Sequence, residues 1–158
     1  MIEPRVGLGF DVHGWGSTGT LRLAGVSFPE RGALLGHSDG DVVCHAVADG
    51  LLGAAALGDL GEHFPDTEPG IAGIGGLELL GEALEKVRAA GFEPMSVDVT
   101  VIADQPAIGP VRAQMRANLA DALGLEPERV SVKATRPEGL GLTGSGVGCL
   151  ALAVVARA

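Results

Sequence analysis

The sequence is poor in cationic residues. Its 158 residues include 11 Lys plus Arg against 20 Asp plus Glu, which gives a formal net charge of -9 at pH 7. A surface that binds nucleic acid needs a stripe of positive charge, so this balance argues against a nucleic-acid partner. An anionic substrate would have to be held by other means, and metal ions and helix N-termini are the usual ones.

Cysteines are also few, and long apolar runs are missing. Cys44 and Cys149 stand far apart and in no Cys-x-x-Cys spacing, which excludes a disulfide framework and a zinc knuckle. The longest apolar run, 147–156, is short of the roughly 20 residues that a membrane-spanning helix needs. The first residues lack the pattern of a signal peptide. We expect two buried thiols in a cytoplasmic protein with no membrane contact.

The remaining composition is that of a globular protein, with 46% hydrophobic and 20% charged residues. The length fits one domain over residues 1–158 with a core of its own. Helical spacing predicts helices at 42–57, 77–89 and 111–123, and 58–70 is predicted to be an irregular polar loop. Strands are predicted at 5–12, 21–24, 26–28, 92–103, 130–135 and 147–156. The last of these is expected to be buried on both faces because it is almost continuously apolar. The mixture favours an α+β fold, a mixed β-sheet with helices packed on one face.

Asp11 and His13 lie two residues apart at the end of the first predicted strand. Side chains at this spacing leave the same face of a strand and can reach one metal ion together. Such a pair is common by chance, so it indicates a metal site only with further support.

The helix predicted at 42–57 supplies that support. Asp41, His45 and Asp49 are spaced four apart and form one polar row on an otherwise apolar helix. Burying the row without partners would cost several kcal/mol, so it faces either a site or the solvent, with Asp41 near the positive end of the helix dipole. Asp49 could orient His45 or only solvate the row. Together with Asp11 and His13, the row favours a zinc site, since two imidazoles and one carboxylate leave the fourth position open.

Residues before this helix and near the C-terminus suggest ligand contacts. Ser38 or Asp39 is expected to cap the helix, and His37 could bind a phosphate oxygen. The acidic segment 59–68 is either a solvated turn or a site for polyol hydroxyls. The segment 139–144 matches Gly-x-Gly-x-x-Gly, but a strand follows it, so we interpret it as a loop that approaches a ligand or another subunit.

Five motifs then occur in order along nearly the whole chain: Gly9-Phe-Asp-Val-His13, Gly36-His-Ser-Asp-Gly-Asp41 followed by His45, Gly58-Asp-Leu-Gly61, Phe64-Pro-Asp-Thr-Glu-Pro69, and Val132-Lys-Ala-Thr135 with Glu138. Together they closely resemble the 2-C-methyl-D-erythritol 2,4-cyclodiphosphate synthase family. The ordered set is far more specific than any one motif.

The resemblance implies a homotrimer with active sites between adjacent subunits. The implied activity is that of a phosphorus-oxygen lyase of the non-mevalonate isoprenoid pathway. It converts 4-diphosphocytidyl-2-C-methyl-D-erythritol 2-phosphate to the 2,4-cyclodiphosphate and releases CMP. Zn²⁺ would be held by Asp11, His13 and His45, and a second ion, Mg²⁺ or Mn²⁺, by Glu138.

The resemblance also implies which residues meet the substrate. His37 and Arg136 would act at the reacting phosphates, and segments 103–109 and 134–136 would lie along the cytidine diphosphate. The full set of implied substrate contacts is Asp11, His13, His37, Ser38, Asp59, Leu60, Gly61, Phe64, Pro65, Asp66, Thr67, Glu68, Ala103, Pro106, Ala107, Gly109, Ala134, Thr135, Arg136, Glu138, Leu142 and Ser145.

The chain departs from the family pattern at three places. Arg136 stands where the family usually has Thr, Ala107 where it has Lys, and Gly144-Ser-Gly-Val-Gly148 where it has Gly-Arg-Gly-Glu-Gly. These departures motivate an alternative, a catalytically weakened trimer that binds metal or isoprenoid ligands. A third possibility is a metal phosphohydrolase that yields a linear product and free phosphate.

Overall fold

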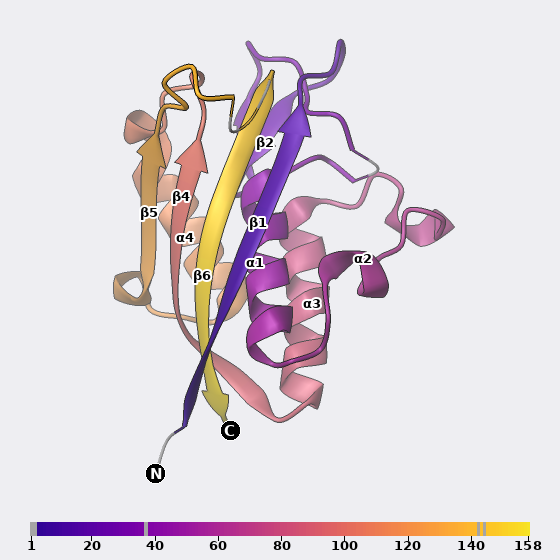
Figure 1. Ribbon diagram of the computed structural model, residues 1–158, viewed down its shortest axis with the longest axis vertical. Coiled ribbons are helices and arrows are strands. Elements are labelled where there is room, and N and C mark those ends of the chain that lie inside the picture. Colours follow the sequence, from indigo (N-terminus) through magenta and orange to yellow (C-terminus); the bar gives the residue numbers. More distant parts are fainter. Residues whose placement is uncertain (1–2, 37, 142, 144) are drawn as a thin grey trace.

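A mixed β-sheet forms one layer of the molecule, and helices lie behind it (Figure 1). The computed structural model describes residues 3–36, 38–141, 143 and 145–158. Within these residues the main sheet consists of β1 (Pro4–Gly14), β6 (Gly146–Arg157), β4 (Phe92–Ile102) and β5 (Val130–Thr135), side by side in that order. β6 is antiparallel to both neighbours, whereas β4 and β5 are parallel. The carboxyl ends of β4 and β5 therefore lie at the same end of the sheet.

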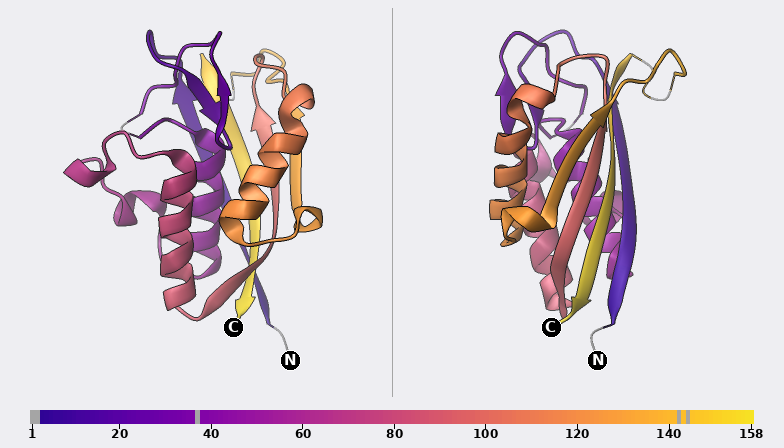
Figure 2. Two further views of the ribbon diagram at one scale, coloured as in Figure 1. Left: turned by 180° about the vertical axis from the view of Figure 1, so that it is seen from behind. Right: turned by 90° about the vertical axis from the view of Figure 1, so that its left-hand side faces the viewer.

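The long helices lie on one face of this sheet, as the edge-on view in Figure 2 shows. They are α1 (Val42–Ala54), α3 (Gly76–Ala89) and α4 (Arg112–Leu123). Shorter elements connect them: the hairpin β2 (Leu21–Leu23) and β3 (Val26–Phe28), the one-turn helix α2 (Leu60–His63), and the 3-10 turns η1 (Pro69–Ile71), η2 (Gly109–Val111) and η3 (Pro127–Arg129). In the described part of the chain no helix covers the opposite face (Figure 2). The predicted α+β fold is confirmed.

Helix α1 packs directly on strand β1 because glycines face it. A Cβ atom added to Gly9 would lie 1.8 Å from the carbonyl oxygen of Ala46, and one added to Gly7 would lie 2.0 Å from that of Gly50. Any side chain at these positions would push the helix away from the strand. The close approach brings His45 on the helix next to Asp11, which is two residues beyond Gly9 on the same face of β1.

The opposite face of β1 and β6 is apolar and exposed. Val6, Leu8, Phe10 and Val12 of β1 are 40–65% exposed, and Leu150 and Leu152 of β6 are 37% and 43% exposed. These six residues are called the outer apolar strip below. The prediction that residues 147–156 are buried on both faces is wrong for the chain alone, since nothing in the described chain covers this side of β6.

The helical segments differ from the predicted ones by more than one residue at two places. The helix predicted at 42–57 ends at Ala54, because Ala56 adopts a left-handed conformation with φ 58°. The segment 58–70, predicted to be irregular, contains α2 and η1. Asp59 caps α2 by accepting a hydrogen bond from the Glu62 amide, so the Asp-x-x-Glu spacing is a start signal that the prediction missed.

Cys44 and Cys149 are buried free thiols, as predicted. Burial raises the pKa of both thiols above the usual range of cysteine. Among the described residues, no helix is both long enough and apolar enough to cross a bilayer.

Candidate metal centre and substrate cavities

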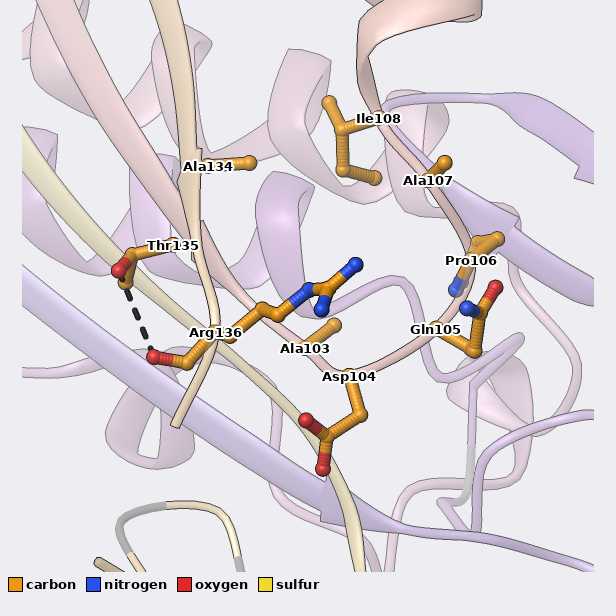
Figure 3. Close-up of a pocket in the computed structure, with 9 residues that line it drawn as sticks. All are labelled: Ala103, Asp104, Gln105, Pro106, Ala107, Ile108, Ala134, Thr135 and Arg136. Carbon is orange, nitrogen blue, oxygen red and sulfur yellow. Dashed lines mark hydrogen bonds between the residues drawn. The ribbon is translucent and has the colours of Figure 1, made fainter. Parts of the chain in front are cut away.

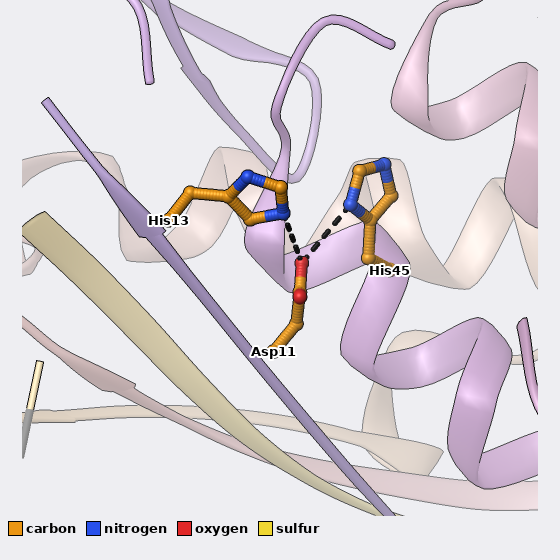
Figure 4. A group of neighbouring side chains, drawn as sticks. All are labelled: Asp11, His13 and His45. Atoms are coloured by element: carbon orange, nitrogen blue, oxygen red, sulfur yellow. Dashed lines mark hydrogen bonds and ion pairs between the residues drawn. The ribbon is translucent and has the colours of Figure 1, made fainter. Parts of the chain in front are cut away.

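Asp11, His13 and His45 meet at the edge of the sheet (Figure 4). Asp11 Oδ2 lies 2.9 Å from His13 Nε2 and 3.0 Å from His45 Nδ1. One ligand atom from each of the three residues lies within 4.8 Å of the others, and the described part of the chain offers no second group of this kind. The predicted juxtaposition of the strand pair with the helix histidine is confirmed.

The two imidazole rings are held in orientations that suit a metal ion. His13 Nδ1 donates to the carbonyl oxygen of Leu35, and His45 Nε2 is 2.9 Å from Ser38 Oγ. In each ring the other nitrogen faces Asp11 Oδ2. Metal-binding histidines commonly use the distal nitrogen in this way, which fixes the ring and its tautomer. Two imidazole nitrogens and one carboxylate oxygen form a donor set that fits Zn²⁺.

Electrostatics at the centre favour a cation. Burial opposes ionisation of Asp11, but hydrogen bonds from His13 and His45 outweigh it and lower the pKa of Asp11 to about 2. The hydrogen bond to Asp11 raises the pKa of His13 above 6.5, although partial burial acts in the opposite direction. An anionic carboxylate thus sits beside two rings whose nitrogens bind either protons or a metal ion.

A cavity opens beside the metal centre and is called the metal-side cavity. It has two adjoining parts of about 150 and 390 Å³ that share Asp11, His45, Leu60 and Gly61. Predicted substrate residues in its lining are Asp11, His13, Ser38, Asp59, Leu60, Gly61, Phe64 and Asp66. The exposed residues Pro65, Thr67 and Glu68 are not in this lining.

A second cavity of about 240 Å³ lies where β4 and β5 end, and is called the strand-end cavity (Figure 3). Its lining includes the predicted residues Ala103, Pro106, Ala107, Ala134, Thr135 and Arg136. Asp104, Gln105 and Ile108 complete it, all within the segment 103–109 that the resemblance assigned to the nucleotide. The Arg136 side chain extends across the space between the two segments (Figure 3).

The two cavities share no lining residue among those described, and they belong to different edges of the sheet. The metal centre is built on β1, whereas the strand-end cavity is built on β4 and β5, and β6 lies between β1 and β4. Adjacent strands are about 4.8 Å apart, so β1 and β5 are separated by roughly 14 Å. One chain therefore presents two separate cavities.

The other predicted site residues lie outside both cavities. Glu138 is exposed on the β5–β6 connection, has φ 52°, and is not in the metal group. Gly109 begins η2, and Ser145 borders a hollow beside Trp15 that shares Asp104 and Gln105 with the strand-end cavity. His37 and Leu142 lie outside the described residues.

Asp41 has a role that the sequence did not predict. It is fully buried and caps α1, with its carboxylate accepting hydrogen bonds from the amides of Val43 and Cys44. The same carboxylate accepts from the amides of Ala24 and Gly25 in the β2–β3 turn. The expectations that Asp41 faces a site or solvent, and that Ser38 or Asp39 is the cap, are therefore wrong. The cap sits directly before Val42, where a helix start requires it.

Asp39 and Asp49 also bind backbone amides. Asp39 accepts from the amides of Asp41 and Gly76 and so connects the starts of α1 and α3. Asp49 Oδ1 accepts from the Leu60 amide at 3.0 Å. Asp49 thus contacts the first residue of α2, which lines the metal-side cavity.

Comparisons with known proteins agree with this picture. The model of the YgbB family matches residues 4–157. A 2-C-methyl-D-erythritol 2,4-cyclodiphosphate synthase from Cronobacter sakazakii is 50% identical over 156 residues, covering 98% of each chain. A solved 2C-methyl-D-erythritol-2,4-cyclodiphosphate synthase in its CDP-bound form has a TM-score of 0.87 at 33% identity, covering 96% of this chain and 99% of the other.

A bifunctional protein is also similar. The structure of the bifunctional IspDF from Campylobacter jejuni has a TM-score of 0.94 at 40% identity. All of this chain is covered, but it spans 43% of that protein's length. The family match over 4–157 and the identity to full-length relatives confirm the resemblance in the motifs, and the chain belongs to the YgbB family of 2-C-methyl-D-erythritol 2,4-cyclodiphosphate synthases.

Proposed function

We propose that this chain converts 4-diphosphocytidyl-2-C-methyl-D-erythritol 2-phosphate to 2-C-methyl-D-erythritol 2,4-cyclodiphosphate and CMP. The observation that carries the proposal is the Asp11, His13 and His45 donor group, which opens into a cavity lined by Ser38 and Asp59. An oxygen of the 2-phosphate forms a bond to the β-phosphorus, and the bond from that phosphorus to the oxygen of CMP breaks. The names of the relatives support this reaction.

The reaction needs no nucleophile from the protein, but it needs the substrate to be held in a reactive conformation. Attacking and leaving groups belong to one molecule, so the protein has to fold the substrate back and neutralise charge. Asp11, His13 and His45 would hold Zn²⁺, and Glu138 would hold Mg²⁺ or Mn²⁺. When bound, these ions supply charge neutralisation at the phosphoryl oxygens and the leaving CMP.

Protein groups then orient the two ends of the substrate. Ser38 and Asp59 border the metal-side cavity, where hydroxyl and carboxylate oxygens suit a phosphorylated polyol. Arg136 brings a guanidinium into the strand-end cavity, where it can donate to phosphate oxygens. We assign His37 and Arg136 to the reacting phosphates.

We infer a homotrimer in which each active site joins the metal-side cavity of one subunit to the strand-end cavity of the next. The separation of the two cavities on one sheet supports this assembly. The outer apolar strip supports it as well, because an exposed patch of Val6, Leu8, Phe10, Leu150 and their neighbours is typical of a subunit interface. We place the protein in the cytoplasm, where a reducing environment suits its two free thiols.

The test is an assay of the purified protein with the substrate, Zn²⁺ and Mn²⁺, followed by phosphorus NMR. The expected result is equal amounts of CMP and cyclodiphosphate. A linear product with free phosphate would identify a phosphohydrolase. Bound metal without CMP release would favour the catalytically weakened trimer. Arg136, Ala107 and Ser145 suggest that alternative because they depart from the family pattern.

A further inference from the structure

Asp49 lies one turn after His45 on α1 but is not part of the metal group. It is partly buried and lines the metal-side cavity together with Asp11, His45 and Asp59. Its Oδ1 atom accepts a hydrogen bond from the Leu60 amide, 3.0 Å away. Asp49 therefore connects the helix that carries His45 to the part of the cavity wall formed by the segment 59–61.

That wall is the start of α2, a helix of one turn. A single turn is not stable by itself in water, so its position depends on bonds to the rest of the chain. The first amides of any helix lack partners within the helix, and Asp49 satisfies the one at Leu60. At the other end of α2, the His63 ring bonds to the carbonyl oxygen of Leu57 through Nε2 at 2.8 Å. Asp49 thus holds the segment 59–61 at Leu60, and the His63–Leu57 bond closes the surrounding segment 57–63 on itself.

We propose that Asp49 is a positioning residue, which fixes the segment 59–61 at a set distance from His45 so that the polyol part of the substrate lies against the metal centre. Helix α1 then determines the positions of both His45 and the segment 59–61. Residues four apart on a helix differ by about 6 Å along its axis, and this rise separates His45 from Asp49. The inference rests on the proposed function for the identity of the ligand, but the Asp49–Leu60 bond exists without it.

The test compares Asp49→Ala with Asp49→Asn, and uses Asp121→Ala on the exposed side of α4 as the control for loss of one carboxylate. Ala is a better helix former than Asp, so Asp49→Ala should retain α1. Hydrogen exchange of the zinc-loaded protein without substrate should become faster in the peptide covering 57–63 and stay unchanged in the peptides of β4 and β5. Asn retains a carbonyl oxygen as acceptor, so Asp49→Asn should preserve most of the protection.

Kinetics give the second measurement. For Asp49→Ala we expect KM to rise about tenfold, the effect of losing one hydrogen bond that orders the wall. The kcat value should change less than about twofold, and the zinc content should not change. Asp121→Ala should behave like the parent protein, and Asp49→Asn should reverse most of the rise in KM seen in Asp49→Ala.

Several outcomes would overturn the proposal. Unchanged exchange at 57–63 in Asp49→Ala would show that the bond does not hold the wall. Loss of zinc, or a fall in kcat at constant KM, would place Asp49 at the metal or the reacting phosphates instead. An Asn variant as impaired as the Ala variant would show that the charge matters and not the acceptor. If the parent protein releases no CMP, the proposed function fails, while the exchange measurement still decides the role of Asp49.

Discussion

His45 Nδ1 lies 3.0 Å from Asp11 Oδ2, although the two residues are 34 positions apart in the chain. Asp11 comes from a strand and His45 from a helix, and neither element alone holds a complete ligand set. The packing of α1 on β1 therefore determines whether the three donor groups of the candidate metal centre meet.

Replacing His45 by Ala should abolish stoichiometric zinc binding. Loss of a group that merely orients a metal ligand weakens affinity about 10- to 100-fold, so loss of the ligand itself should exceed about a hundredfold. Elemental analysis after gel filtration measures this directly. His63→Ala is the matched control, because His63 bonds to Leu57 outside the metal group. Zinc retained at one equivalent by the His45 variant would refute the three-residue site.

Zinc affinity should fall as the pH drops. The pKa of His13 is raised above 6.5, chiefly by its hydrogen bond to Asp11, so below that pKa a proton on His13 competes with the metal. His13 should contribute about a tenfold loss of affinity per pH unit in this range. Asp11, with a pKa of about 2, stays ionised throughout. Competition with a zinc indicator between pH 5 and 8 checks the slope, and a flat profile would contradict it.

In the metal-free protein, the contribution of His13 to stability should fall as the pH rises, whereas zinc affinity rises with pH. A raised folded-state pKa of His13 means that its stabilising bond to Asp11 is fully present below pH 6.5 and is lost as the pH rises through the raised value. The lowered pKa of Asp11 gives stability that is present above pH 3.8 and lost as the pH falls toward about 2. The gain in Tm from added zinc should therefore increase from pH 5.5 to 8.5. Calorimetry with EDTA or zinc measures it, and a gain that shrinks over this range would count against the assignment.

Gly9→Ala should damage both the fold and the metal centre. The added methyl group would meet the Ala46 carbonyl oxygen at 1.8 Å, and forced expansion of a packed interior costs about 1–3 kcal/mol. We expect a lower free energy of unfolding together with weaker zinc binding, measured by urea denaturation and elemental analysis.

Gly53→Ala provides the control on the same helix. Nothing lies within 4 Å of a Cβ atom at Gly53, and Ala is better than Gly inside a helix by about 0.5–1 kcal/mol. This variant should be slightly more stable and should retain zinc. Equal effects of the two substitutions would show that the close approach of α1 to β1 is unimportant.

Leu8→Glu should dissociate the proposed trimer. Leu8 is 65% exposed in the outer apolar strip, and burying an unpaired carboxylate there costs several kcal/mol. The association constant should drop at least about a hundredfold, with activity lost in proportion. Light scattering and the CMP assay measure both, with Ala117→Glu on the exposed side of α4 as control. A Leu8→Glu protein that stays trimeric would place the interface elsewhere.

The sequence predicted the strand pair and the helix histidine of the metal centre for separate reasons. Asp11 and His13 follow from the two-residue period of a strand, and His45 follows from the polar row on α1. The same row misled the interpretation of Asp41, because that residue precedes the helix and caps it. A spacing of four residues places side chains on the same face only when all of them lie inside the helix, and Asp41 lies before its first residue.

Other features depended on tertiary contacts that no local pattern contains. Residues 147–156 are apolar throughout, but whether Leu150 and Leu152 are covered depends on what packs outside the sheet. The end of α1 at Ala54 follows from the left-handed conformation of Ala56, a residue with no intrinsic preference for it. The bond from Asp49 to Leu60 joins two elements whose approach could not be predicted from either.

The buried carboxylate of Asp41 has a consequence for how metal enters the protein. It accepts hydrogen bonds from amides of the β2–β3 turn and of the first turn of α1. These bonds hold the start of the helix that carries His45 without any metal ion. Small zinc domains fold only when the ion arrives, whereas here the start of the helix is held by hydrogen bonds to Asp41, which is not one of the metal donor groups. Loading should then be an exchange of protons and water for the ion at a preformed receptor, and repeated stripping and reloading should proceed without refolding of the chain.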